Sequence, residues 1–370
     1  MRFSIGEPVP WFSSNTHTTS NFQFSAAAGR FVVLTFLGAA VRPDARQIIA
    51  DIEAARVSFD DERLCFFGVT MDPEDIRQGR LREILPGIRY FQDFDASISS
   101  SYGVVPQGMT RFNIDADYRP MTLILDQRLR VLHWLPVTNN GVGHVARILE
   151  LTRGFPQPIE HQPGEIQAPI LIAPRIFEPE FCDMLIDYYR KTGSEDSGFM
   201  RDQNGKTVGV YDYGTKRRRD CVIEDENIRK QCMFRIHDRL VPEIQRAYQF
   251  NATRMERYIV ACYEGEHGGH FKAHRDNTTK GTAHRKFAVS LNLNDDYDGG
   301  FVWFPEFGRH LHKAPRGGAC VFSCSLLHEA TPVTRGTRYV FLPFLYDDAA
   351  AKLRETNAQF LGGDLTPRPS

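Results

Sequence analysis

His274, Asp276 and His328 are the residues whose types and spacing could hold a metal ion. Side chains two positions apart in an extended strand point to the same face, roughly 6–7 Å apart. His274 and Asp276 could therefore bind one ion together, with His328 as a third ligand. Two imidazoles and one carboxylate form the facial triad that binds non-haem Fe(II) and leaves positions open on the metal. The spacing alone also allows His328 to be the cap of a strand end.

The segment from Phe287 to Asp347 has the pattern of short strands separated by turns rich in glycine and proline. We expect strands at 287–294, 301–305, 319–323, from residue 328 onward, and at 338–346. Many short strands at intervals of roughly ten residues predict a β-sandwich or jelly roll. Closure of a jelly roll brings late strands beside early ones, which would place His328 near the first two candidate ligands.

Arg338 opens the last of these strands, just after the turn Thr334-Arg335-Gly336. A guanidinium inside a β-barrel costs free energy unless a partner carries the opposite charge. A dicarboxylate cosubstrate would supply that charge, since the fork of an arginine matches a carboxylate bidentately. Arg335 is the rival candidate, but it adjoins the turn glycine and is expected to be solvated. We therefore choose Arg338.

Four segments resemble the prolyl-4-hydroxylase branch of the Fe(II)/2-oxoglutarate dioxygenases. They are APILIAPRIFEPEFCDMLI, ACYEGEHGGHFKAHRDN, GGFVWFPEFG and LLHEATPVTRGTRYVFLPF. The resemblance covers about Ala168 to Asp347. It is specific, because the metal pair, the Gly-Gly turn, the distal histidine and the basic residue follow one another in order. It implies a double-stranded β-helix, or jelly roll, with flanking helices.

The resemblance also implies roles for individual residues. His274, Asp276 and His328 would bind Fe(II), and Arg338 would pair with the far carboxylate of 2-oxoglutarate. Tyr263 matches a tyrosine that lines this pocket in relatives, although a strand tyrosine that fills the core is the alternative. O2 is implied as cosubstrate, ascorbate as a further cofactor, and hydroxylation of an unactivated C–H bond as the outcome.

The candidate triad positions an oxidant and not a substrate, so the sequence leaves three functions open. The first is hydroxylation of a prolyl or similar residue in a protein or peptide, and the second is the same chemistry on a small molecule. The third is a thiol-redox or binding protein that senses iron or 2-oxoglutarate. The basic run Lys216–Arg219 is either a solvated face or part of a lid that selects an acidic or peptide substrate.

His267 and His270 flank the metal pair and raise the alternative of a zinc site. No HExxH motif occurs, because the pair His328-Glu329 has no second histidine at the required spacing. No paired cysteines supply a structural zinc site either. We therefore favour iron over zinc.

The composition is that of a globular protein with more than one domain: 370 residues, 42% hydrophobic, with a formal net charge of −1. Such a charge favours neither nucleic acid nor a membrane as partner. No apolar stretch approaches the roughly 20 residues of a membrane span, and the first residues lack a signal-peptide pattern. The seven cysteines contain no CxxC pair and are expected to be reduced thiols. We expect a cytoplasmic protein.

Pro156, Pro158 and Pro163 punctuate a polar run that separates the two halves of the chain. We expect a first domain at 1–154, a Pro-rich linker at 155–167, an oxygenase domain at 168–347 and a polar tail at 348–370, mostly unpacked from Ala351 onward.

The first 154 residues alternate expected strands and helices. Phe31–Leu37 and Leu64–Thr70 are apolar runs typical of strands buried on both faces. Helices are expected at 42–59, 73–85 and 142–153, and paired strands at 120–126 and 131–137. This order resembles the α/β thioredoxin-like fold in its peroxiredoxin form.

One departure from that resemblance matters for function. A peroxiredoxin places its reactive cysteine in the turn after the first long strand, at a helix N-terminus that lowers the thiol pKa. Here that turn, Gly38–Pro43, contains no cysteine, and Cys65 lies inside an apolar strand. We therefore expect a degenerate scaffold for docking, substrate selection or homodimerisation.

Overall fold

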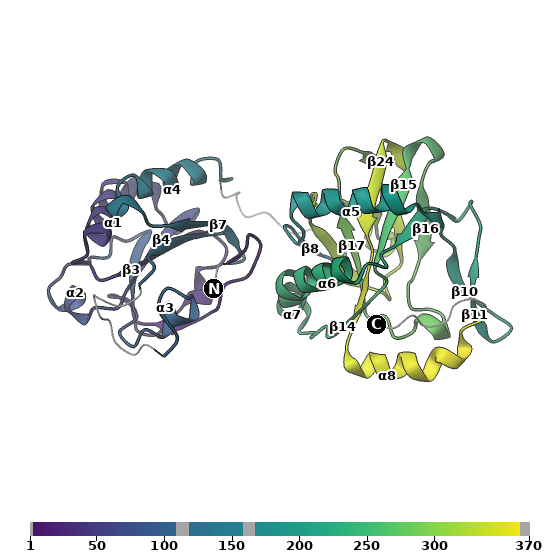
Figure 1. Ribbon diagram of the computed structural model, residues 1–370, viewed down its shortest axis with the longest axis horizontal. Coiled ribbons are helices and arrows are strands. Elements are labelled where there is room, and N and C mark those ends of the chain that lie inside the picture. The colour runs from purple at the N-terminus through teal and green to yellow at the C-terminus, as the bar shows by residue number, and fades with distance from the viewer. Residues whose placement is uncertain (1–2, 109–117, 158–166, 363–370) are drawn as a thin grey trace. The chain divides into compact units, whose positions relative to one another are not determined.

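The computed structural model describes residues 3–108, 118–157 and 167–362, which form two compact units (Figure 1). The first unit spans Met1–Gln162 and the second Pro163–Ser370. The division falls inside the segment that the sequence analysis assigns to a linker. None of the described helices combines the length and the apolar character that a membrane crossing requires.

The first unit is built on a mixed sheet with the strand order β5-β4-β3-β6-β7. Its central strands β3 (Phe31–Gly38) and β4 (Leu64–Thr70) are parallel and buried at every residue, as their apolar runs predict. β5 (Ile88–Gln92) is parallel to β4, whereas β6 (Met121–Leu125) and β7 (Val131–Pro136) form the antiparallel pair. This arrangement is the thioredoxin-like, peroxiredoxin-type fold expected from the sequence.

Helices cover both faces of this sheet (Figure 1). α1 (Pro43–Ala54) and α4 (His144–Thr152) pack on one face, and α3 (Ser97–Ser101) contributes to the core on the other. α2 covers Pro73–Arg77, so the helix expected at 73–85 is too long. The chain leaves the helix at Gly79, whose φ of 62° lies in the left-handed region.

Two large sheets, accompanied by two two-stranded ones, build the second unit and give the jelly roll expected from the short strands. The larger sheet has the order β14-β25-β17-β24-β15-β13-β9 with β21 and β8 beyond β17, and the smaller has the order β12-β16-β22-β19-β20. The strands of the larger sheet are β8 (Leu171–Ala173), β9 (Glu195–Asp196), β13 (Arg219–Val222), β14 (Arg254–Glu256), β15 (Ile259–Glu264), β17 (Phe287–Asn292), β21 (Ala319–Ser323), β24 (Thr337–Phe341) and β25 (Phe344–Tyr346). The strands of the smaller sheet are β12 (Lys216–Arg217), β16 (His270–His274), β19 (Val302–Trp303), β20 (Leu311–His312) and β22 (His328–Ala330).

Three helices cover the outer face of the larger sheet (Figure 1): α5 (Pro179–Thr192), α6 (Glu226–Arg235) and α7 (Val241–Tyr248). Alternation along β15 separates the two faces of this sheet. Cys262 belongs to the core beneath the helices, whereas Tyr263 borders the cavity between the sheets. Side chains at every second strand position therefore face the interior of the jelly roll.

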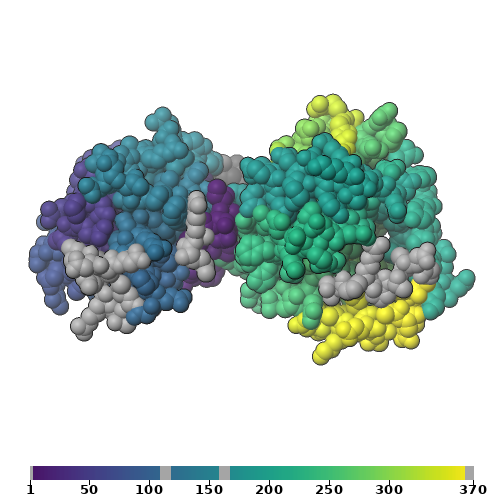
Figure 2. Space-filling view, viewed as in Figure 1, coloured from purple at the N-terminus to yellow at the C-terminus, as the bar shows by residue number. Residues whose placement is uncertain are grey.

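The described part of the C-terminal segment is folded, so the expectation of an unpacked tail is wrong there. α8 (Asp348–Asn357) lies on the surface of the second unit (Figure 2, yellow) and continues into a 3₁₀ turn at Ala358–Phe360. Leu361 then pairs with Thr207 of the hairpin formed by β10 (Phe199–Gln203) and β11 (Lys206–Val210). The polar composition hid this docking because backbone hydrogen bonds, and not an apolar stripe, hold much of it. Residues 363–370 lie outside the described ranges.

Candidate metal centre

Two paired strands of the smaller sheet bring the candidate ligands together. His274 ends β16 and lies directly opposite His328, the first residue of β22. Asp276 lies in the turn beyond β16, where its backbone N–H donates to the carbonyl of Cys324 over 3.0 Å. The expectation that His274 and Asp276 share one strand is therefore wrong, although the two side chains still meet. The strand therefore ends earlier than the sequence pattern indicates.

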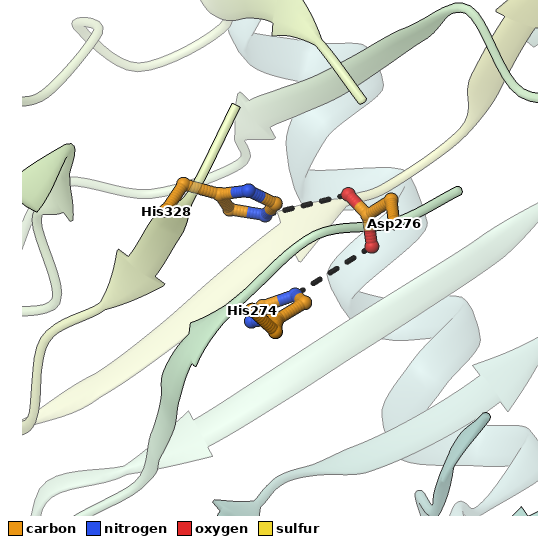
Figure 3. A group of neighbouring side chains, drawn as sticks. All are labelled: His274, Asp276 and His328. Atoms are coloured by element: carbon orange, nitrogen blue, oxygen red, sulfur yellow. Dashed lines mark ion pairs between the residues drawn. The ribbon is translucent and has the colours of Figure 1, made fainter. Parts of the chain in front are cut away.

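The three side chains point toward one another (Figure 3). Nε2 of His274 lies 3.5 Å from Oδ1 of Asp276, and Nε2 of His328 lies 3.3 Å from Oδ2. The candidate ligand atoms all lie within 4.8 Å of one another, which is close enough to hold one metal ion. His328 is buried and the other two side chains are mostly buried, so the site is sheltered from water.

A hydrogen bond at Nδ1 of each ring fixes the tautomer and the orientation of the two histidines. Nδ1 of His274 lies 2.7 Å from the Lys272 carbonyl oxygen, and Nδ1 of His328 lies 3.0 Å from that of Leu326. A carbonyl only accepts, so each Nδ1 carries the proton and each Nε2 keeps a lone pair for the shared space. This outer hydrogen bond is typical of metal-binding histidines.

The electrostatics of the site favour a neutral His274 imidazole beside an ionised Asp276 carboxylate. Burial lowers the pKa of His274. Burial alone would raise the pKa of Asp276, but His328 and His274 hold it well below its ordinary value. These are the protonation states that a divalent cation requires of its ligands.

Other histidines near the motif stay outside this cluster. Within residues 3–108, 118–157 and 167–362, the group formed by His274, Asp276 and His328 is the one that meets the geometry of a three-residue metal site. His267 is exposed, and Nδ1 of His270 bonds to the Gly268 carbonyl instead. A zinc site built from these two histidines therefore finds no support in the described residues.

Arg338 borders the same cavity from β24 and is 2% exposed. Its Nη2 donates to Ser290 Oγ over 2.7 Å, and its Nε and Nη2 donate to Asn292 Oδ1 over 3.1 and 3.0 Å. Among the described residues no carboxylate forms an ion pair with Arg338. A buried guanidinium with neutral partners fits a carboxylate that arrives with a ligand.

The neighbours of Arg338 explain two sequence features. Tyr263 is its register partner on β15, and the Tyr263 ring centroid lies 5.4 Å from the guanidinium carbon. A Cβ atom at Gly300 would lie 2.9 Å from Cδ of Arg338, so the Gly-Gly turn leaves room for this side chain. Arg335 is exposed and pairs with Asp298, as expected of the rival candidate.

Sequence reasoning missed two further arginines of this cavity, Arg218 and Arg257. Lys216 and Arg218 of the basic run are buried, while Arg217 and Arg219 are exposed. The run is therefore not a uniformly solvated face. The sequence could have indicated this, because residues two positions apart in a strand point to the same side. Arg218 is followed at that spacing by Asp220, with which it forms an ion pair.

Among residues 3–108 and 118–157, the first unit has no comparable group of candidate metal ligands. A Cβ at Gly38 would lie 2.8 Å from Cζ of Tyr118, so the turn before α1 is closely packed. The backbone N–H of Ala40 donates to Oδ2 of Asp75 over 2.8 Å. Cys65 is fully buried, and burial raises the pKa of its thiol to about 12. All seven cysteines lie within the described ranges, and each is buried and free.

Comparisons with known proteins match the two halves separately. Residues 258–346 match the model of the 2OG-Fe(II) oxygenase superfamily, and residues 5–133 match that of the AhpC/TSA family. A PKHD-type hydroxylase of Paracoccus denitrificans (strain Pd 1222) is 39% identical over 83 residues, 20% of this chain and 37% of the relative. One from Synechococcus sp. (strain JA-3-3Ab) is 32% identical over 88 residues, 22% and 38% of the two chains. The chain thus spans little more than a third of the curated relatives it matches.

Solved structures show the same division. A Trichoplax adhaerens prolyl hydroxylase in complex with a hypoxia inducible factor peptide fragment is 17% identical, with a TM-score of 0.39, covering 51% of this chain and 87% of that one. The Xanthomonas campestris bacterioferritin comigratory protein is 15% identical, with a TM-score of 0.32, covering 40% and 97%. On the family models alone, the N-terminal half of the chain contains an AhpC/TSA domain and the C-terminal half a 2OG-Fe(II) oxygenase domain.

Proposed function

We propose that this protein is an Fe(II)- and 2-oxoglutarate-dependent dioxygenase that hydroxylates an unactivated C–H bond, in a prolyl or similar residue of a protein or peptide. The observation that carries the proposal is the convergence of His274 Nε2, His328 Nε2 and the Asp276 carboxylate in a sheltered cavity that Arg338 also borders. Two neutral nitrogens and one carboxylate fit Fe(II).

When bound, Fe(II) with 2-oxoglutarate and O2 supplies the oxidation that converts C–H to C–OH, with succinate and CO2 as the other products. The chain orients its ligands through the Nδ1 hydrogen bonds of His274 and His328. Arg338 and Ser290 bind the far carboxylate of 2-oxoglutarate through charge-assisted hydrogen bonds. Val302 and Phe322 add apolar surface to the lining of the cavity, which helps to exclude water from it.

The finer parts of this proposal concern substrate and surroundings. The PKHD-type relatives are named as hydroxylases, and the peptide complex of the Trichoplax enzyme favours a protein or peptide substrate. A small molecule is the alternative. We include ascorbate as a further cofactor, a location in the cytoplasm and a homodimer through the N-terminal domain.

The test uses the full chain with Fe(II), 2-oxoglutarate and O2. Succinate formation is measured first alone and then with a proteolytic digest of cellular proteins, in which mass spectrometry searches for residues heavier by one oxygen atom. We expect succinate in both reactions and hydroxylated peptides in the second. Asp276→Ala is the matched control, and succinate at the same rate in that variant would refute the proposal.

A further inference from the structure

The cavity around the candidate ligands contains more cations than the proposed function uses. Arg218, Arg257 and Arg338 all line it. Lys216 lies buried behind Phe271, with its Nζ 4.8 Å from the ring centroid. Arg338 is assigned to 2-oxoglutarate, which leaves three cations without a role.

Lys216 and Arg218 are held by groups of the protein itself. Arg218 donates from Nε and Nη2 to the two carboxylate oxygens of Asp220, each over 2.7 Å. Lys216 donates to Ser197 Oγ over 2.7 Å and to the Gly198 carbonyl over 2.6 Å. These contacts fix the two side chains and satisfy much of their donor capacity.

Arg257 differs because it has no close carboxylate partner of its own among the described residues. Its nearest is Oδ2 of Asp220, 3.4 Å from Nη2, and that oxygen already accepts hydrogen bonds from Arg218 and Ser197. The guanidinium carbon lies 5.3 Å from the Phe344 ring centroid, and the side chain is 30% exposed. Arg257 therefore keeps donors available at the cavity.

The backbone of Arg257 is also held in an unfavourable conformation. Its φ is 66°, in the left-handed region that residues with a side chain rarely adopt. Strain of this kind persists where the surrounding structure imposes it, and it gathers at functional sites. This backbone conformation, just before β15 begins, places the guanidinium of Arg257 at the cavity.

A charge count points to an anionic partner. Arg218, Arg257 and Arg338 outnumber Asp220 and Asp276, and the charges of Fe(II) and the 2-oxoglutarate dianion cancel each other. Glu329 also borders the cavity. It lies between the inward-facing His328 and Ala330 of β22, so its side chain points to the opposite face. The loaded site would keep an excess of positive charge, which is costly in a sheltered cavity unless an anion joins it.

Arg338 and Arg257 reach the cavity from different parts of the larger sheet. Arg338 lies on β24 and pairs in register with Tyr263, whereas Arg257 lies between β14 and β15, next to Glu256, which pairs with Phe344. The Tyr263 ring centroid lies 5.4 Å from the guanidinium carbon of Arg338 and 5.8 Å from that of Arg218. A ligand carboxylate held by Arg338 therefore leaves Arg257 to a second ligand.

We propose that Arg257 binds a carboxylate of the primary substrate, close to the C–H bond that is hydroxylated. The inference rests on the proposed function and adds a substrate class to it. The substrate is an acid: a peptide with Asp or Glu beside the target residue, or a free amino or imino acid. In both cases one carboxylate meets the guanidinium of Arg257, and the two sources are separated by the test.

The experiment measures succinate formation by the full chain with Fe(II) and 2-oxoglutarate in the presence of matched probes. One pair consists of N-acetylated, C-amidated peptide pools with a central proline, flanked by Ala, Ser, Asp and Glu in one pool and by Ala, Ser, Asn and Gln in the other. The second pair is L-proline and L-prolinamide. The variants are Arg257→Gln, Arg257→Lys and the exposed control Arg335→Gln.

We expect the acidic probe of at least one pair to stimulate succinate formation more than its amide counterpart. A charge-assisted hydrogen bond predicts that Arg257→Gln raises the KM for that probe roughly 10- to 100-fold, with a smaller effect on kcat. Arg257→Lys should restore part of the preference, which a merely structural role would not explain, and Arg335→Gln should keep it.

Three outcomes would overturn the inference alone, and in each the parent chain forms succinate. Acidic and amide probes stimulate succinate formation equally, or neither kind stimulates it, or the preference for acidic probes survives Arg257→Gln and therefore depends on another residue. Absence of succinate in every reaction, together with absence of Fe(II) binding, would instead be failure of the proposed function itself, and the substrate class would fall with it.

Discussion

The two domains each have the fold of a catalytic family, but they differ in what occupies the place where the chemistry belongs. In the C-terminal domain, polar side chains from separate strands converge in a sheltered cavity: two histidines, one aspartate and a buried arginine. In the N-terminal domain, the turn Gly38–Pro43 carries no nucleophile and packs against Tyr118. The comparison shows that a fold determines where a site lies but does not supply its reactive groups.

The largest expected effect comes from removing the charged ligand. Asp276→Ala should abolish Fe(II) binding and lower 2-oxoglutarate turnover by more than roughly 100-fold, because loss of even an outer partner of a metal ligand costs about 10- to 100-fold. Metal content and succinate formation are the measurements. Asp295→Ala, at an exposed position on another turn, is the matched control and should bind iron normally.

The next effect concerns the buried arginine. Arg338→Ala removes a charge-assisted bidentate partner and should raise the KM for 2-oxoglutarate roughly 30- to 150-fold, equivalent to about 2–3 kcal/mol. Arg335→Ala should change it little, since that side chain is exposed and pairs with Asp298. Initial rates at varied 2-oxoglutarate concentration decide the matter. Reversed sensitivities would show that the wrong arginine has been chosen.

A smaller effect is expected where the C-terminal segment meets the hairpin. The Gly362 N–H donates to the Thr207 carbonyl over 3.0 Å, and Lys206 Nζ donates to that of Gln359 over 2.5 Å. A chain that ends at Asn357 should show about five- to tenfold faster hydrogen exchange in β10 and β11, since each such bond contributes about 1 kcal/mol. A chain that ends at Gly362 is the control, and equal exchange in both would contradict the docking.

The N-terminal domain should lose stability in mild acid through His144. This imidazole is buried and Nε2 lies 2.8 Å from Thr122 Oγ1. Burial lowers the pKa of His144 below its ordinary value of 6.5, so the unfolded chain binds the proton more readily. The stabilisation is complete above that value and is lost as the pH falls below it. Thermal unfolding of the full chain at pH 7 and pH 5 should show the loss, and His144→Gln should reduce it.

For the rate of peroxide reduction we expect no effect at all. Without a low-pKa thiolate in the turn Gly38–Pro43, the full chain should not accelerate peroxide reduction by a thiol reductant. Cys65→Ser should change nothing, because the Cys65 thiol is buried and its pKa is raised to about 12. If the chain consumes peroxide in a thiol-dependent reaction that Cys65→Ser abolishes, the N-terminal domain has a reactive group after all and the difference between the two domains does not hold.

Elements that are marked by a local pattern of residues could be predicted from the sequence alone. The apolar run at Leu64–Thr70 became β4 at the bounds expected, and Ala319–Ser323 became β21 in the same way. Residue type and order were enough to select His274, Asp276 and His328, because few patterns combine two imidazoles and a carboxylate at strand spacing with a Gly-Gly turn between them. Arg338 followed from the cost of a buried charge.

Features that depend on contacts with residues distant in the chain are known only from the tertiary structure. Asp276 lies in the turn beyond β16, where its N–H bonds to the carbonyl of Cys324, a residue 48 positions later. Pro343 divides the strand expected at 338–346 into β24 and β25, because a proline lacks the N–H that a ladder needs. Arg218 turns inward because Asp220 and Tyr263 meet it there. Local patterns fix which residues alternate, but only the packed sheets determine which face becomes the interior and which charges meet inside it.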